Sequence, residues 1–112
     1  KDVSSGALDG INSLINKVID LQSSHMKNVL TRFICFFMNT LSNDYNEDYA
    51  NMLYVTIQKL QQSNIMQLCQ NSIELWIGNN DLRRNKANEL LQSQTKDIFL
   101  NCASKLRLLK IV

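Results

Sequence analysis

The sequence predicts an all-α protein: a single-domain bundle of four to five helices that spans residues 1–112. First, the chain has no proline and only three glycines, whereas average usage would give about five or six prolines at this length. Second, apolar residues recur at steps of three and four, which is the spacing of one helix face. Third, residues 29–38 form a dense apolar run. Asn28, Arg32 and Asn39 keep this run far from the 20 or so apolar residues of a membrane span.

The central helix of the bundle is expected at residues 24–41, because three of the four phenylalanines fall there. Apolar residues follow its main face at helical spacing, and further apolar side chains fill its other sides. A helix that is apolar on most sides is a buried one, so the other helices should wrap around it. The main-face residues are Met26, Leu30, Phe33, Phe37 and Leu41.

Three further helices are expected around this centre. The first begins at Ser4 or Ser5 and ends near residue 22. The next is capped by Asp44 or Asn46 and ends near Leu60, where residues 61–64 form a polar break. A helix over 65–77 follows, with Trp76 facing inward. It ends at 78–80 (Gly-Asn-Asn), since glycine and asparagine tolerate the left-handed conformation that ends helices.

A long C-terminal helix is expected over residues 81–110, with Asp81 as its cap. Residues 92–95 are the one stretch that could interrupt it. Several apolar residues fall off its main seam, so it either packs against neighbours on two sides or exposes an apolar strip for a partner. These off-seam residues are Leu82, Leu90, Leu100, Leu108 and Ile111.

Charge is spread unevenly along the chain. Residues 1–80 carry five basic and seven acidic side chains, whereas residues 81–112 carry seven basic and three acidic ones. This excess is too weak for a nucleic-acid-binding protein, which would show a clear basic surplus and a recognisable motif. It suits an acidic protein surface, and arginine is favoured at protein interfaces. The candidate partner-binding residues are Arg83, Arg84, Lys86, Lys96 and Arg107.

The three cysteines, Cys35, Cys69 and Cys102, fall on predicted apolar helix faces. They are either small buried side chains or one interhelical disulfide with a free thiol left over. A single histidine and no Cys-x-x-Cys pair argue against a metal site. No catalytic or phosphate-binding motif is present, so we expect no cofactor and no enzymatic activity.

Residues 1–8 (KDVSSGAL) look like a mature N-terminus, and they precede a proline-free helical body with sparse core cysteines. In these features the chain resembles the anophensin/albicin-type salivary proteins of anopheline mosquitoes. The resemblance implies a secreted, non-enzymatic inhibitor of host defence. Such a protein would bind a host plasma protein and so block complement convertase assembly or contact-pathway (coagulation) activation.

Two other functions fit the same sequence. One is an intracellular helical protein–protein interaction module, or a fragment of a helical-repeat protein. Three free thiols would favour this alternative, whereas one native disulfide would favour secretion. The other is a carrier of an apolar ligand, in which Phe33, Phe36, Phe37 and Trp76 would line a cavity.

Overall fold

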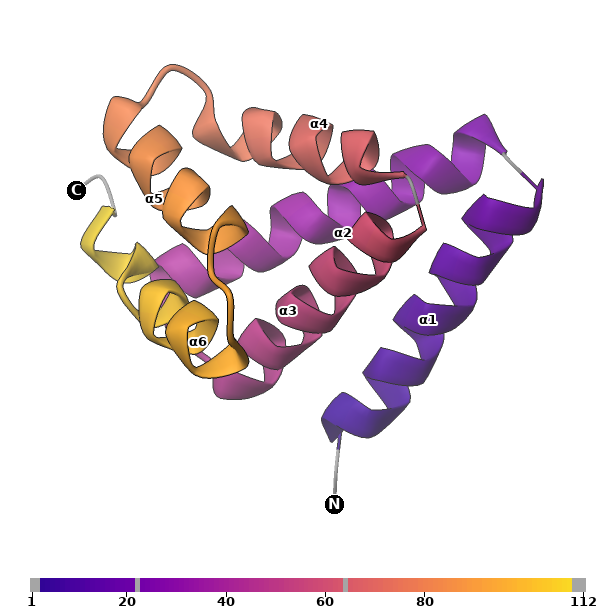
Figure 1. The fold of residues 1–112 in the computed structure, drawn as a ribbon, viewed down its shortest axis with the longest axis horizontal. Coiled ribbons are helices and arrows are strands. Elements are labelled where there is room, and N and C mark those ends of the chain that lie inside the picture. Colours follow the sequence, from indigo (N-terminus) through magenta and orange to yellow (C-terminus); the bar gives the residue numbers. More distant parts are fainter. Residues whose placement is uncertain (1–2, 22, 64, 110–112) are drawn as a thin grey trace.

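The computed structural model describes residues 3–21, 23–63 and 65–109, without the side chains of residues 3–8 and 11. Within these residues the chain forms six α-helices and one short 3₁₀-helix, and no strand (Figure 1). The predicted all-α bundle is therefore confirmed. The elements are α1 (Val3–Leu21), α2 (Ser24–Asn43), α3 (Glu47–Gln62), α4 (Met66–Ile77), α5 (Asp81–Leu91), α6 (Lys96–Ser104) and η1 (Leu106–Leu109).

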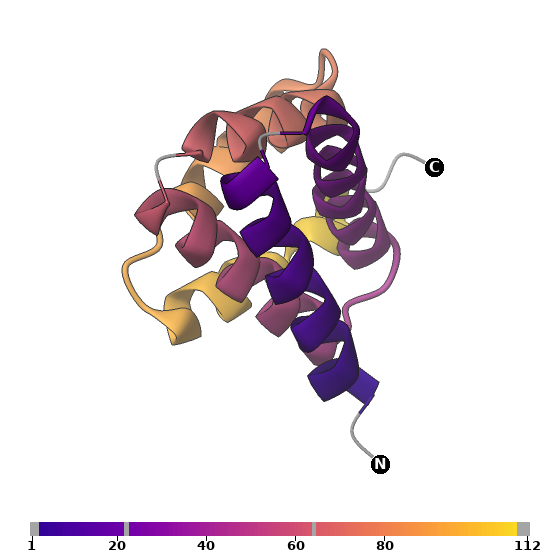
Figure 2. The same ribbon diagram turned by 90° about the vertical axis from the view of Figure 1, so that its right-hand side faces the viewer.

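Helix α2 is the central element, as the sequence predicts. It contacts α1, α3, α4 and η1, which surround it (Figures 1 and 2). Its buried apolar side chains belong to one continuous core with those of the surrounding helices. Burial of such side chains is the main favourable term in folding, which explains why the other helices collect around α2. The buried apolar residues of α2 are Leu30, Ile34, Phe37, Met38 and Leu41.

The side of α2 that carries Phe33 and Phe36 is not buried. Phe33 is 41% exposed and Phe36 is 54% exposed, so the prediction that Phe33 faces the core is wrong. From Leu30, a step of three leads to Phe33 and a step of four leads to Ile34, and both steps fit one helix face. In the structure the buried residue is the one at the step of four, Ile34, which is fully buried. Helix α2 therefore presents a second, uncovered apolar side.

Side-chain caps begin four of the helices. Ser23, Asn46, Asn80 and Thr95 each accept a hydrogen bond from the backbone N–H three residues further on. These caps satisfy donors that the first turn of a helix leaves without partners. Asn80, rather than the expected Asp81, caps α5. The turn before it is made by Gly78, whose φ of 56° lies in the left-handed region that glycine favours.

The prediction of a single long helix over 81–110 is wrong, because the chain turns at residues 92–95. Thr95 caps α6 by accepting a hydrogen bond from the Ile98 N–H at 3.2 Å. The turn brings Phe99 and Leu106 back against the core, where both are buried. One straight helix would carry its far end away from the core. Residue 110 lies outside the described part.

The break at residues 92–95 also determines which of the off-seam apolar residues of this region are buried. Leu90 is buried and Leu100 is partly buried, whereas Leu82 and Leu108 are exposed. The exposed pair lies on two different elements, α5 and η1. An apolar strip along one helix is therefore not formed by the described members, and Ile111 lies outside the described residues.

Helix α1 lies at the edge of the bundle, against α2 and α3 (Figure 2). Ile15 and Val18 bury their side chains in the core, and Leu14 packs partly against it. Gly10 lies one to two turns before these residues and has no side chain. A Cβ atom added there would meet no atom within 4 Å. Among the described residues, there is therefore open space beside Gly10.

Candidate binding surface

An apolar hollow of 530 Å³ lies between α1, α2 and α3. We call it the aromatic hollow. Half of its lining residues come from α2, with Gly10 and Leu14 contributed by α1 and two residues by α3. Gly10 brings no side chain to this lining, and Leu14 is the described side chain that α1 contributes. The residues that line it are Gly10, Leu14, Val29, Phe33, Phe36, Phe37, Tyr49 and Met52.

Phe37 forms the floor of the aromatic hollow and is only 4% exposed. Three other rings surround it: the ring centroids of Phe33, Phe36 and Tyr49 lie 6.3, 6.2 and 6.0 Å from that of Phe37. Aromatic pairs at such distances attract one another and hold their rings in defined positions. The hollow therefore has a fixed aromatic floor and two exposed aromatic walls.

A second hollow of 380 Å³ adjoins the first, and we call it the outer hollow. It is lined by Val29, Arg32, Phe33 and Phe36, so the two hollows share three residues of α2. Arg32 stands four residues before Phe36, one turn along the same side of the helix. A cation therefore lies at the rim of a continuous apolar surface.

Trp76, the fourth aromatic residue of the hypothesised cavity, does not line either hollow. It is 2% exposed on α4 and packs in the core. Arg83 covers it: the guanidinium carbon lies 5.0 Å from the centroid of the indole ring. Arg83 Nη1 also donates a 2.7 Å hydrogen bond to the Trp76 carbonyl. The phenylalanines of the predicted cavity thus line the aromatic hollow, whereas Trp76 does not.

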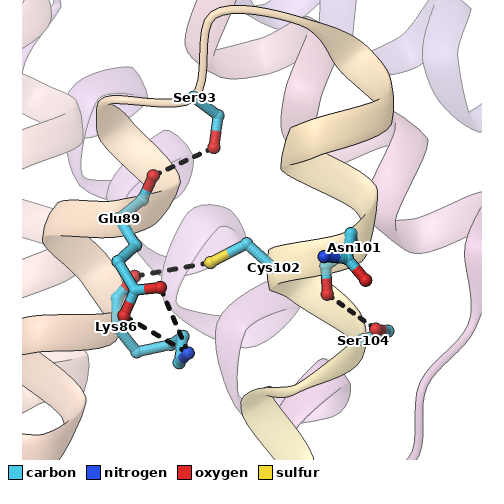
Figure 3. A network of polar contacts seen from close by, with 6 residues as sticks. All are labelled: Lys86, Glu89, Ser93, Asn101, Cys102 and Ser104. Atoms are coloured by element: carbon cyan, nitrogen blue, oxygen red, sulfur yellow. Dashed lines mark hydrogen bonds and ion pairs between the residues drawn. The ribbon is translucent and has the colours of Figure 1, made fainter.

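The cations of α5 are engaged within the protein. Besides Arg83, Arg84 forms an ion pair with Glu74 at 2.8 Å, and Lys86 forms one with Glu89 at 3.3 Å. Figure 3 shows the second pair, together with the Cys102 thiol, whose sulfur lies 3.9 Å from the Lys86 carbonyl oxygen. These contacts tie α5 to α4 and α6 and reduce the charge available to a partner.

Lys96 and Arg107 complete the set of cations predicted to bind a partner. Both are exposed, on α6 and η1 respectively. Neither has an ion pair with any described residue. The five cations therefore divide into three that interact with other described residues and two that have no ion pair among the described residues.

The three cysteines are free thiols on three different helices. Burial raises the pKa of the Cys69 thiol on α4 to about 12. It also raises the pKa of Cys102, and that of Cys35, where the charge of nearby Arg83 opposes it in part. A raised pKa keeps a thiol protonated and unreactive. Cys69 and Cys102 are buried, whereas Cys35 is only partly buried.

Among the described residues, no group of three His, Cys, Asp or Glu side chains is placed to hold a metal ion. No helix in the same residues is long and apolar enough to cross a membrane. The described residues that line the aromatic hollow include no acid, base or nucleophile apart from the Tyr49 phenol. The arrangement suits binding of an apolar group.

Comparison of the chain with protein-family models, with curated proteins and with solved structures gave no match.

Sequence reasoning missed several residues of this surface. From the sequence, no role in binding is assigned to Val29, Arg32 or Gly10. One signal could have found them: Val29, Arg32, Phe33 and Phe36 share one side of α2 at steps of three and four. A cation among these apolar residues indicates that this side reaches water.

Proposed function

We propose that this chain is a non-enzymatic binding protein, that the aromatic hollow is its binding site, and that its ligand has an extended apolar part. The observation that carries the proposal is the hollow itself, with a buried aromatic floor and the exposed walls Phe33 and Phe36. This is the carrier of an apolar ligand that the sequence suggested, with a binding site that does not include Trp76.

The size and the chemistry of the aromatic hollow support this proposal. Its volume of 530 Å³ falls within the range of about 300–1,000 Å³ that is typical of small-molecule sites. Two half-exposed phenylalanine rings side by side leave apolar surface in contact with water, and a ligand that covers it gains about 25 cal/mol per Å². The described residues leave Phe33 and Phe36 exposed, and a bound ligand would cover them.

The test is calorimetric titration of the full chain with dodecanol, an uncharged single-chain probe. We expect saturable binding at one site. Phe36→Ala should weaken it about tenfold, because most of one aromatic wall is lost. Leu75→Ala is the matched control, since Leu75 is an equally exposed apolar residue on α4, which does not line the hollow. Absence of binding, or equal losses in both variants, would contradict the proposal.

A second candidate is a secreted inhibitor that binds a plasma protein of the complement or contact pathway. The resemblance to anopheline salivary proteins suggests this partner class. The exposed Lys96 and Arg107, which have no ion pair among the described residues, favour it. Exposed cations steer an acidic partner and supply specificity at the rim of an interface. The remaining predicted cations act inside the protein, so the interface would centre on α6 and η1.

Capture from vertebrate plasma tests this candidate, with identification of the bound proteins by mass spectrometry. We expect the double variant Lys96→Glu/Arg107→Glu to lose capture of a complement or contact factor. Arg84→Glu is the control. It also reverses a positive charge, at a residue that is already paired with Glu74. If no plasma protein is captured above background, or if the double variant captures it unchanged, this candidate is wrong.

A further inference from the structure

We infer that the ligand of the aromatic hollow is a free long-chain carboxylate, whose tail lies in the hollow and whose headgroup binds Arg32. This inference rests on the proposed function and adds the chemical class of the ligand. It follows from the position of one cation and from two observations on the described residues: this cation has no ion pair among them, and none of those that line the hollows is acidic.

The position of Arg32 links the two hollows. The aromatic hollow and the outer hollow share Val29, Phe33 and Phe36, and the outer hollow adds Arg32 at its edge. A molecule that enters the aromatic hollow past Phe33 and Phe36 must therefore leave its outer end near the guanidinium. An amphiphile with one polar end matches this order of apolar wall and cation.

Arg32 is also available for binding. It is exposed, and within the described residues it has no ion pair. By contrast, Arg83 and Arg84 both have partners inside the protein. None of the described residues that line either hollow is acidic. A guanidinium binds a carboxylate through two parallel hydrogen bonds, which makes arginine well suited to this headgroup.

The geometry favours a single molecule over a membrane surface. Recognition of an anionic membrane relies on a cluster of several basic residues near the lipid headgroups. Here one arginine stands beside a concave space of 530 Å³. One charge and one apolar hollow match one headgroup and one tail.

The experiment compares three probes of equal chain length by calorimetry, each below its micelle concentration: dodecanoate, dodecanol and dodecyltrimethylammonium. We expect dodecanoate to bind about three- to tenfold more tightly than dodecanol, as for one partly exposed charge pair. The ammonium probe should bind most weakly. High salt should narrow these differences, because it screens an exposed charge pair.

Arg32→Gln should remove the preference for dodecanoate over dodecanol. Arg107→Gln is the matched control, since it removes an exposed arginine from η1, which lines neither hollow, and it should retain the preference. Circular dichroism verifies that both variants are folded. If dodecanoate and dodecanol bind equally to the unaltered chain, or if Arg32→Gln keeps the preference, the inference is wrong while the hollow remains a binding site.

Failure of the proposed function has a different signature, in which none of the three probes binds. A membrane-surface function is tested separately with vesicles of phosphatidylcholine and phosphatidylserine. We expect the protein to stay in the supernatant when these vesicles are sedimented. Co-sedimentation that depends on Arg32 would overturn the assignment to a free carboxylate.

Discussion

The two sides of α2 differ in how completely the rest of the chain covers them. On the side that faces α4 and η1, which we call the closed side, Ile34 and Met38 are fully buried. On the side that faces α1 and α3, which we call the open side, Phe33 and Phe36 remain exposed around the aromatic hollow. Both sides are apolar in sequence.

The same difference appears in the arginines. Near the closed side, Arg83 covers Trp76 and donates a hydrogen bond to its carbonyl. On the open side, Arg32 adjoins Phe36 and has no ion pair among the described residues. On the closed side, Trp76 and Arg83 thus stabilise the fold. On the open side, Phe36 and Arg32 are exposed and are available to a ligand.

The largest expected effect tests whether the closed side carries the stability. Trp76→Ala should lower the free energy of unfolding by about 3–5 kcal/mol, because it leaves a cavity in the core. Phe36→Ala should lower it by about 0.5 kcal/mol or less, because the ring is half exposed. Urea unfolding monitored by circular dichroism measures both. Similar losses in the two variants would remove the distinction between the sides.

Next in size is the pH dependence of stability that Cys69 imposes. Burial raises the pKa of this thiol from 9.0 to about 12, so the folded state holds its proton more tightly than the unfolded state. The resulting stability is complete below pH 9 and is lost as the pH rises toward 12, by up to about 1.4 kcal/mol per pH unit.

Urea unfolding of the unaltered chain and of Cys69→Ala, at neutral pH and at about pH 10, isolates this contribution. Cys69→Ala should lose less stability on the rise in pH than the unaltered chain does. Cys35→Ala is the control, because Cys35 is only partly buried on α2. Identical pH dependence in Cys69→Ala and the unaltered chain would show that this thiol is not buried as described.

Arg83 and Arg32 sharpen the comparison between the arginines. Arg83→Met should cost about 1–2 kcal/mol, since it removes a hydrogen bond and a cation–π contact with Trp76. Arg32→Met should change the free energy of unfolding by about 0.5 kcal/mol or less. Thermal and urea unfolding measure the pair. A cost for Arg32→Met equal to that for Arg83→Met would mean that Arg32 also acts inside the fold.

The smallest expected effect concerns the open space beside Gly10 on α1. Gly10→Ala should stabilise the protein by about 0.5–1 kcal/mol, because glycine weakens a helix interior and the added Cβ meets no atom within 4 Å. Gly78→Ala is the opposite control: its φ of 56° is strained for alanine, so it should destabilise. Destabilisation by Gly10→Ala would indicate that α1 packs tightly there and that the hollow is narrower than described.

The fold class and the central helix were predictable because helical spacing and the absence of proline are local properties of the sequence. The division of the C-terminal region was not, although residues 92–95 were recognised as the one possible break. Whether such a stretch bends depends on whether Phe99 and Leu106 gain more by folding back onto the core, which is a tertiary effect.

The candidate site was predictable only in its residue types. Sequence grouped Phe33, Phe36, Phe37 and Trp76 in one cavity, yet the structure separates Trp76 from the others. It also grouped the cations of the last third, of which α5 uses three internally. Spacing along one helix shows which residues share a side, whereas the covering of that side depends on helices elsewhere in the chain.

The most direct test of the open side as a binding site is NMR titration of the labelled full chain with dodecanol. We predict shift changes in the Val29 and Leu14 methyl groups and the Phe33 and Phe36 rings, with the Trp76 indole N–H unchanged. Changes at the Trp76 indole with none at Val29 or Leu14 would place the ligand elsewhere and contradict the account.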